Sequence, residues 1–183
     1  RFIDTVRNLK NIVLREINNY AGPHKITLNR NPVNLGIGAH VNRVMELAHG
    51  ELIVVAAGDD ISLPERTATI VSKWEESGKK PDSLHSAAFR IGCDGAYIGT
   101  VRPTDFSLKT PEDILRSEAP IIGATHAWTR KVFDVFGILN SDVVIEDRVI
   151  LHRALLKGGI RYIDIPLVKH RVGGISSNIS DYK

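Results

Sequence analysis

The sequence has little of what disulfide-bonded, cysteine-metal or membrane-spanning proteins require. Its 183 residues include a single cysteine, Cys93, so neither a disulfide framework nor a cluster of cysteine ligands can form within this chain. A lone cysteine is compatible with a reducing compartment. No apolar run approaches the roughly 18 residues that a membrane-spanning helix needs. From these absences we expect a cytoplasmic protein.

A strong excess of one charge and low-complexity segments are absent too. The formal net charge is +3 and the charged residues are scattered, so no basic patch for nucleic acid is indicated and no nucleic-acid partner is expected. The hydrophobic content of 43% and charged content of 25% are ordinary for a globular protein. The length suits one α/β domain with a core of its own. We therefore predict a single domain over residues 1–183, in which the polar tail 173–183 is mobile.

What is present centres on a loop, a helix and a strand that end in two acids. Asn34–Gly38 is a polar loop with two glycines. The helix after it is predicted by apolar residues at helical spacing, which are Val41, Val44, Met45 and Ala48. Leu52–Ala57 is an unbroken apolar run, typical of a strand buried on both faces of a parallel sheet. Asp59 and Asp60 follow at its carboxyl end, where ligands bind in open α/β sheets.

The other elements are predicted from periodicity and from glycine and proline signals. They are a first helix that ends at Gly22–Pro23, a short strand Lys25–Leu28, a helix with a capping box at Ser62–Glu65, a strand Ser83–Ile91 in a hairpin with Ala96–Val101, short helices at Thr110 and Arg130–Phe136, a helix Glu146–Lys157, and a strand Ile160–Ile165 broken by Pro166. This order predicts an α/β fold with a mainly parallel sheet and a mixed edge.

Two neighbouring carboxylates at a strand-to-loop junction suit a hard divalent cation. Mg²⁺ and Mn²⁺ prefer oxygen ligands and are commonly shared between one or two carboxylates and the phosphates of a substrate. Alternatively, Asp59 and Asp60 only complement the dipole of the helix that follows. The dipeptide by itself leaves both interpretations open.

The wider context resembles the family 2 glycosyltransferases, which have the GT-A fold. The resemblance is carried by five motifs at matching spacing: Asn34-Leu35-Gly36, Asn42 near the helix start, Gly50-Glu51-Leu52-Ile53, Gly58-Asp59-Asp60 and Pro64-Glu65-Arg66. In that family the acidic element often begins with one more acid, and Ala57 stands at its place here. The metal site that the resemblance implies therefore depends on Asp59 and Asp60.

The second half of the chain extends the resemblance to residues of the reaction. Glu146-Asp147 opens a helix where the family carries its catalytic base, which implies Asp147 as the base, ahead of Glu146. The alternative is helix-dipole complementation. Lys169-His170-Arg171 loosely resembles the family's cluster over the donor phosphates. The implied substrate-binding residues are Asn34, Gly36, Asn42, Asp59, Trp128, His170 and Arg171.

Two residues fall where the resemblance places the acceptor side of the cleft, namely His126 and Trp128. An indole can stack on a sugar ring because it has an apolar face and a polar edge. A place for Trp128 in the hydrophobic core is the alternative.

The resemblance implies an inverting, metal-dependent glycosyltransferase of the hexosyltransferase class. Such an enzyme uses Mg²⁺ or Mn²⁺, a nucleotide-diphospho-sugar donor and a glycan or lipid-linked acceptor, for example in polysaccharide biosynthesis. Association with the inner face of the membrane is compatible with these acceptors. The sequence does not indicate the sugar, the nucleotide or the oligomeric state.

Two strands that begin the family's fold and hold the nucleotide have no counterpart in this chain. We therefore expect either an N-terminally incomplete glycosyltransferase domain or a relative that has lost activity. The main alternative function is non-catalytic binding of a carbohydrate or nucleotide. A nucleotidyltransferase is a further alternative, but the glycine-rich nucleotide loop with Arg or Lys that such enzymes normally carry at their start is not found in this sequence.

Overall fold

The computed structural model describes residues 2–103, 110, 112 and 121–173. The chain divides into two compact units, residues 1–34 and 35–183, where the sequence predicted a single domain. The first unit contains α1 (Phe2–Asn19), the predicted first helix. The predicted strand Lys25–Leu28 is wrong, because these residues are exposed and form no strand. The predicted mobile tail and most of the helix expected at Thr110 lie outside the described residues.

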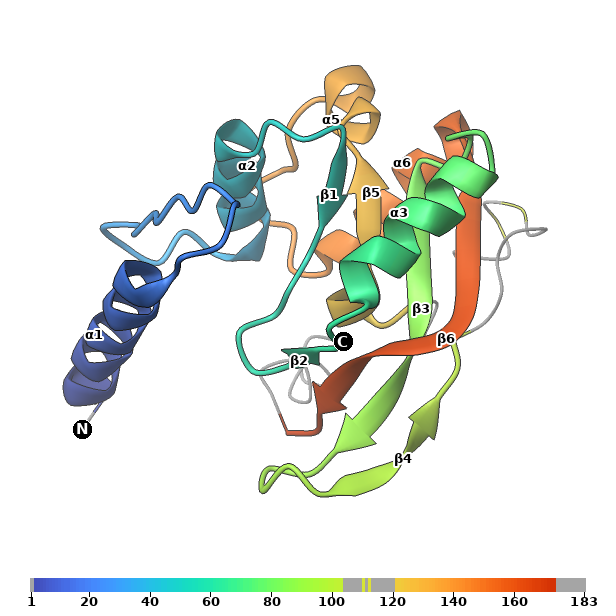
Figure 1. Cartoon of the computed structure of the whole chain (residues 1–183). Helices are drawn as coiled ribbons and strands as arrows, with labels where there is room; N and C mark the ends of the chain where they lie inside the picture. The colour runs from blue at the N-terminus through green and yellow to red at the C-terminus, as the bar shows by residue number, and fades with distance from the viewer. Residues whose placement is uncertain (1, 104–109, 111, 113–120, 174–183) are drawn as a thin grey trace. The chain divides into compact units, whose positions relative to one another are not determined.

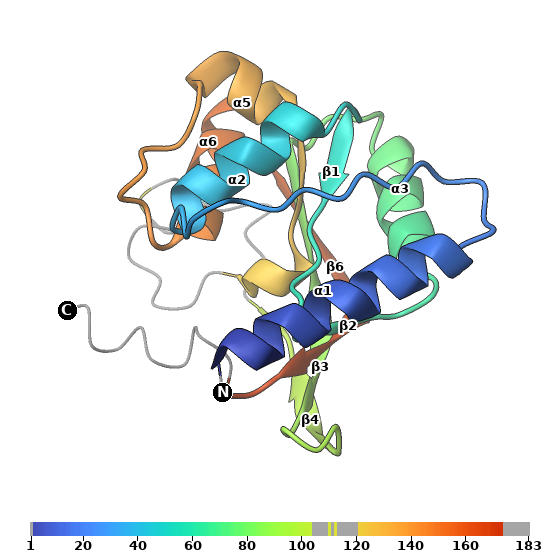
Figure 2. The ribbon, with the colours of Figure 1, turned by 90° about the vertical axis from the view of Figure 1, so that its left-hand side faces the viewer.

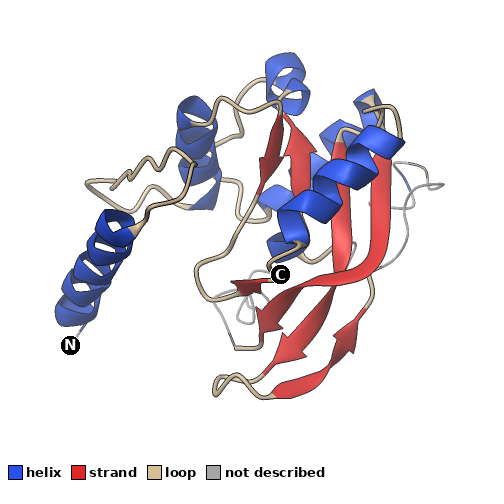
Figure 3. Cartoon of the chain, in the orientation of Figure 1, coloured by secondary structure: helices blue, strands red, loops and turns tan. Residues whose placement is uncertain are grey.

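The second unit is a six-stranded sheet with helices on both faces (Figures 1 and 3). Its strands are β1 (Leu52–Val54), β2 (Ile61–Ser62), β3 (Ser83–Ile91), β4 (Tyr97–Val101), β5 (Ala127–Thr129) and β6 (Ile160–Arg171). Its helices are α2 (Ile37–Leu47), α3 (Arg66–Glu76), the 3-10 helix η1 (Gly123–Thr125), α5 (Lys131–Phe136) and α6 (Glu146–Lys157). Figure 2 shows α3 on one face of the sheet and α2, α5 and α6 on the other.

The strand order is β1-β5-β3-β6-β2, with β4 paired to β3 outside this path. Among the described strands only β3 and β6 form a parallel pair, and the other four pairings are antiparallel. The prediction of a mainly parallel sheet is therefore wrong, although the α/β fold class is confirmed. The reason is β5, which the sequence did not indicate as a strand. It enters from η1 without a crossover helix and runs antiparallel between β1 and β3. The strands β1 and β3 have the same direction, but β5 separates them, so they do not form a parallel pair.

The apolar run that begins at Leu52 is shorter and less buried as a strand than predicted. The strand β1 ends at Val54, all three of its residues are half-buried, and β5 is its neighbour in the described sheet. Both faces of β1 are nevertheless covered, since Leu52 and Val54 pack on the side of α3 and Ile53 packs on the opposite side. The prediction of a strand that is covered on both faces therefore holds for β1, but the burial is partial.

Pro166 does not end the last strand, which continues to Arg171. The register between β3 and β6 shifts between Ser86 and Ala88, at the position where Ala87 is paired with Pro166. A proline has no N–H for the ladder and is accommodated where the pairing is irregular. This irregularity lets one long strand contribute to the sheet and still carry its last residues to the functional site.

Two hydrophobic clusters hold the helices on the sheet. The first cluster is formed by Met45, Trp128, Val132, Phe133, Leu139, Ile150 and Ala154, which come from α2, β5, α5, α6 and the segment after α5. The second cluster is formed by Ile70, Trp74, Leu84, Ala127, Ile163 and Leu167, which place α3 on the opposite face. Since the helices are fixed from both faces, the loops at the end of the sheet have a rigid base.

Candidate functional site

A cavity of about 490 Å³ lies in the second unit. Its lining comes from five segments, which are Ile37 at the start of α2, residues of the β1–β2 connection, residues 121–124 at η1, residues 144–147 at the start of α6, and residues 170–173 at the end of β6. Both acidic pairs of the sequence, Asp59-Asp60 and Glu146-Asp147, line this cavity. Residues that are far apart in the chain are thus brought to one site.

Asp60 is already engaged by the end of β6. Its side chain is only 4% exposed, and His170 Nδ1 lies 3.2 Å from both of its carboxylate oxygens. The backbone N–H of Arg171 donates a hydrogen bond of 2.7 Å to Asp60 Oδ1. Asp59, in contrast, is exposed. The two neighbouring acids therefore differ, since Asp60 anchors β6 and Asp59 is accessible to a ligand.

The guanidinium of Arg171 joins three parts of the cavity wall. Its Nε donates to the backbone carbonyl of Asp59 at 3.0 Å, and its Nη1 donates to the carbonyls of Gly92 and Cys93, both at 2.9 Å. The sequence predicted that Arg171 would contact the donor phosphates. In the structure these nitrogens donate to backbone carbonyls. Arg171 thereby holds the acidic loop, which is the segment Gly58–Asp60, and the β3–β4 turn on β6.

Glu146 and Asp147 are the first two residues of α6. Asp147 Oδ1 accepts a 2.7 Å hydrogen bond from the backbone N–H of Arg148. Burial raises the pKa of Asp147 above its ordinary value, and burial together with the charge of Asp147 raises the pKa of Glu146. A carboxylate with a raised pKa holds a proton more tightly, which is the property that a general base needs.

Asp147 lies directly against the backbone of η1 at Gly123. A Cβ atom built on Gly123 would stand 2.9 Å from Asp147 Oδ2, and the three atoms nearest to it all belong to the Asp147 side chain. Only glycine leaves room for the carboxylate at this distance. Gly123 was not predicted as a site residue, because nothing in the local pattern shows which side chain approaches it.

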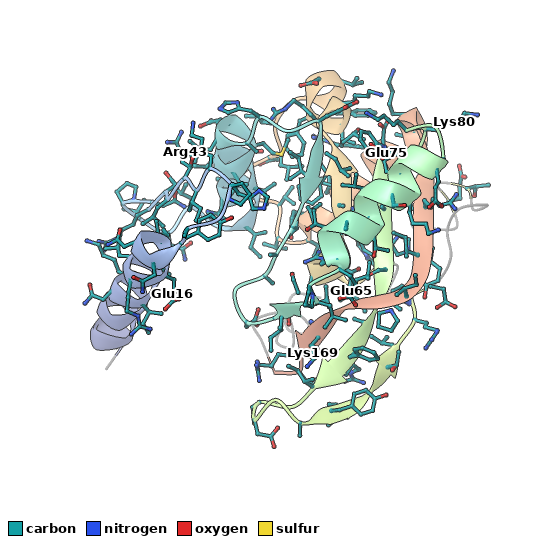
Figure 4. All side chains as sticks on the ribbon, in the orientation of Figure 1. Glu16, Arg43, Glu65, Glu75, Lys80 and Lys169 are labelled. Carbon is teal, nitrogen blue, oxygen red and sulfur yellow. The ribbon has the colours of Figure 1, made fainter. Side chains whose placement is uncertain are left out.

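Arg66 was also not recognised as a site residue, and it is 2% exposed. Its Nη1 donates to Ser62 Oγ and its Nη2 to the carbonyl of Ala124, both at 2.8 Å. Its neighbour Glu65, labelled at the start of α3 in Figure 4, is exposed. One sequence signal was available, because Arg66 precedes the buried Ile70 and Trp74 at steps of four residues and so shares their helix face.

The capping box predicted at Ser62–Glu65 does not form. The N-cap residue of α3 is Glu65, which makes no side-chain capping bond. Ser62 lies in β2, and its hydroxyl accepts the hydrogen bond from Arg66. Ser62, which the sequence predicted as a helix cap, therefore accepts a hydrogen bond from the buried Arg66 instead.

Two predicted substrate residues are placed elsewhere. Trp128 is 4% exposed, packs against Phe133 in the first cluster and does not line the cavity, so its predicted stacking on a sugar is wrong. The side-chain amide of Asn42 donates to the carbonyl of Leu139 and accepts from its N–H, both at 2.8 Å. Asn42 thus fixes the loop after α5 on α2 and does not line the cavity.

The remaining predicted residues have different positions. Gly36 is the N-cap of α2 with a positive φ of 75°, which favours glycine, and it precedes the cavity-lining Ile37. Asn34 belongs to the first unit. His126, expected on the acceptor side, is fully buried, and its Nε2 lies 2.7 Å from Ser83 Oγ. Burial lowers the pKa of His126 to about 3, so it is a neutral core histidine.

The donor set at the acidic loop suits a metal that is shared with a diphosphate. Within the described part of the chain, no group of three or more His, Cys, Asp or Glu side chains is arranged to hold a metal ion. Mg²⁺ is commonly bound by one or two carboxylates, with substrate phosphates and water completing the octahedron. The exposed Asp59 and the partly engaged Asp60 fit that arrangement, and they do not form a complete protein cage.

Comparisons with known proteins agree with the fold and with the sequence resemblance. No protein-family model matches the chain. An uncharacterized glycosyltransferase from Methanocaldococcus jannaschii is 31% identical over 85 residues, which are 46% of this chain and 29% of that protein. The chain therefore spans less than a third of this relative.

Among solved structures, the chain is similar to TarS 1–349 from S. aureus, with a TM-score of 0.62 and 16% identity over 86% of this chain and 47% of TarS. The TarS complexes with UDP-GlcNAc and with UDP are similar as well, with TM-scores of 0.60 and 0.62, identities of 15% and 16%, and 87% of this chain covered in both. They are covered over 46% and 47% of their own length. These structures are glycosyltransferases of GT-A type. The predicted GT-A-like α/β fold and the resemblance to glycosyltransferases are thus confirmed.

Proposed function

We propose that this chain, which has a GT-A-like glycosyltransferase fold, transfers a sugar from a nucleotide-diphosphate donor to an acceptor hydroxyl with inversion at the anomeric carbon. The observation that supports the proposal is the shared cavity, in which Asp59 and Asp60 lie with Glu146 and Asp147. In the proposal the first pair supplies carboxylate ligands for a metal-bound diphosphate, and the second pair supplies a buried carboxylate as the base. The complexes of TarS with UDP and UDP-GlcNAc make a UDP-linked sugar the first donor to test.

In this mechanism Asp147 accepts the proton of the acceptor hydroxyl. The hydroxyl oxygen then forms a bond to the anomeric carbon while the bond from that carbon to the donor phosphate breaks, and the electron pair leaves with the nucleoside diphosphate. A single displacement of this kind inverts the anomeric centre. The raised pKa of Asp147 makes the carboxylate a better proton acceptor near neutral pH.

His170 and Arg171 hold the acidic segment that, in this proposal, binds the diphosphate of the donor. His170 and the backbone of Arg171 hold the Asp60 carboxylate, and the Arg171 side chain holds the carbonyl of Asp59. The acidic loop is thus fixed before a donor arrives, which lowers the entropy lost on binding. When bound there with the donor, Mg²⁺ or Mn²⁺ would neutralise charge on the leaving diphosphate as a Lewis acid.

The experiment that tests the proposal is a panel of nucleotide sugars scored by thermal unfolding with and without Mn²⁺, followed by a test for release of nucleoside diphosphate. A donor that binds the folded chain raises Tm by mass action, and we expect UDP-GlcNAc with Mn²⁺ to do so. No shift with any donor would overturn the proposal. A shift without diphosphate release over a range of glycan and lipid-linked acceptors would instead identify a non-catalytic binding protein.

A further inference from the structure

We propose that Arg66 and Gly123 are positioning residues, which together fix η1 under the Asp147 side chain and so determine where this carboxylate stands in the cavity. The inference rests on the proposed function, because it concerns how the proposed base is placed. It assigns roles to two residues that do not themselves accept a proton or hold a metal.

The first step of the argument is that η1 is held by a buried cation. Arg66 spans from Ser62 Oγ in β2 to the carbonyl of Ala124 in η1, with two bonds of 2.8 Å from different nitrogens. Arg66 is nearly inaccessible to water, and loss of its guanidinium would leave the half-buried Ala124 carbonyl without this donor. A planar fork reaches both acceptors at once, which the single ammonium of a lysine cannot do in the same way.

The second step is that η1 forms the surface on which Asp147 lies. The closest approach to a Cβ at Gly123 is the Asp147 carboxylate, at 2.9 Å for Oδ2 and 3.5 Å for Cγ. Real Cβ atoms rarely approach this closely, so an added methyl group would push this side chain. Because Gly123 and Ala124 are adjacent, the bond from Arg66 to Ala124 also fixes the place of Gly123.

The third step is that the same arginine also interacts electrostatically with Asp60. Burial lowers the pKa of Arg66, and the negative charge of Asp60 acts in the opposite direction and favours the protonated form. Arg66 therefore has a hydrogen bond to the segment beneath Asp147 and an electrostatic interaction with one acid of the other pair.

The decisive variant is Gly123→Ala, which adds one methyl group against Asp147. A displacement of about 1 Å at a reacting group can lower a rate about 100-fold, so we expect kcat to fall roughly 10- to 100-fold while the donor KM changes less than about threefold. In an Asp147→Asn background the same substitution should have no further effect on the residual rate, because the partner it displaces no longer acts as the base. An unchanged kcat, or an equal loss in both backgrounds, would overturn the proposal.

Arg66 is tested by three variants. Arg66→Met should lower kcat, and Arg66→Lys, which keeps the charge but not the fork, should remain clearly below the native rate. Lys73→Met is the matched control, since Lys73 is a cation on the same helix whose ammonium contacts Glu76, and it should leave kcat unchanged. Full activity of Arg66→Lys would show that the charge and not the hydrogen-bonded span matters, and would contradict the positioning role.

A further measurement requires neither a folded Arg66→Met variant nor glycosyl transfer. The carboxyl ¹³C resonance of Asp147, assigned by its loss in Asp147→Asn, is followed through a pH titration in native protein and in Gly123→Ala. A changed shift and titration midpoint in the variant supports the placement of Asp147 by η1, even if no donor is turned over. An identical titration curve in both proteins contradicts it.

Discussion

Asp147 and Glu146 begin α6 as a pair whose protonation is controlled by burial. Burial raises the pKa of both carboxyl groups from their ordinary values, and for Glu146 the negative charge of Asp147 adds a smaller contribution in the same direction. The more buried residue with the backbone hydrogen bond, Asp147, is the better candidate for a base with a fixed position.

Replacement of Asp147 by asparagine tests this assignment. The amide would keep the shape of the side chain but could not accept the acceptor proton, so we expect kcat to fall about 10²- to 10⁴-fold. Donor affinity, measured by calorimetry, should be within a factor of a few of the native value. Glu146→Gln serves as the matched control, and a larger loss in that variant would exchange the roles of the two acids.

Stability at acid pH should report on His126. Its folded pKa of about 3 lies below the unfolded value near 6.5, so the unfolded chain binds the proton more readily. The free energy of unfolding therefore falls as pH falls through the window from about 6.5 to 3, by at most about 1.4 kcal/mol per pH unit from this group. Urea unfolding at several pH values measures the slope.

The raised pKa values of Glu146 and Asp147 act in the opposite direction, since the folded state then binds protons more readily than the unfolded state. For this reason the slope of the native protein must be compared with that of His126→Gln, which removes the titrating ring. If the free energy of unfolding of His126→Gln fell with decreasing pH as steeply as that of the native protein, or more steeply, a group other than His126 would dominate the loss of stability at acid pH.

At the level of single residues, the sequence predicted the acids and missed what holds them. Asp59, Asp60, Glu146 and Asp147 follow strand ends or helix starts, which local patterns indicate. Arg66 and its acceptor Ala124 are 58 positions apart, and no local spacing reports such a contact. Trp128 was ambiguous because an indole suits both a sugar and a core.

Among the elements, the end of β6 organises the acidic loop and the β3–β4 turn through Arg171. Arg171→Ala removes three hydrogen bonds to the carbonyls of Asp59, Gly92 and Cys93. We expect a loss of about 1–2 kcal/mol in the free energy of unfolding, because partly exposed bonds from a cation contribute modestly. Amide hydrogen exchange should become faster in both loops.

The control for Arg171→Ala is Arg102→Ala. Arg102 forms an exposed ion pair with Asp164, and such pairs contribute little to stability. Faster exchange confined to the β3–β4 turn, with the acidic loop unaffected, would contradict the view that Arg171 links these loops.

The irregular pairing around Pro166 predicts that β6 tolerates a proline at this position, but not at regularly paired positions of the same strand. Pro166→Ala should cost only about 0.4–1 kcal/mol, mainly through greater freedom of the unfolded chain. Val168→Pro, two residues later, should cost about 3 kcal/mol or more, since Val168 is fully buried and paired on both sides, with Ala88 and Ser62. Chemical denaturation compares the two, and equal losses would show that the irregularity has no protective effect.

The helices α2, α3, α5 and α6 could be predicted from the sequence, since each buries apolar residues, although α3 begins at Arg66 and not at the predicted cap. The strands were harder to predict from the sequence. The stretch that forms β5 is three residues long, too short for a period to be recognised, and Pro166 was taken as an end because its missing N–H is harmful only in a regular ladder. Strand direction depends on such connections, which explains why the mainly parallel sheet was wrong.

For the whole molecule, the distribution of charge around the cavity matters more for binding of an anionic donor than the net charge does. The net charge is +3, yet four carboxylates line the cavity, and Arg171 in its wall is directed to backbone carbonyls. A diphosphate would meet this negative potential unfavourably. None of the described helices is long and apolar enough to cross a membrane, and association with a membrane face stays a prediction.

We therefore expect donor affinity to depend on a divalent cation. Calorimetric titration with UDP-GlcNAc should show at least about tenfold tighter binding, or about 1.4 kcal/mol, with Mn²⁺ than with EDTA. Asp59→Asn should remove most of this difference because its carboxylate is the accessible one. Equal affinity in both buffers would exclude a metal from donor binding.

The mismatch in length between β3 and β6 has one more consequence. Twelve residues of β6 lie against nine of β3, and both ends are in register while the middle absorbs the excess. The middle of β6 is thus a place where evolution could lengthen or shorten the chain without unpairing either end. Because the last residues of β6 keep their own pairing with β3, a residue gained or lost in the middle would leave His170 opposite Arg90 at the wall of the cavity. The site is thus insulated from changes of length in the strand that carries it.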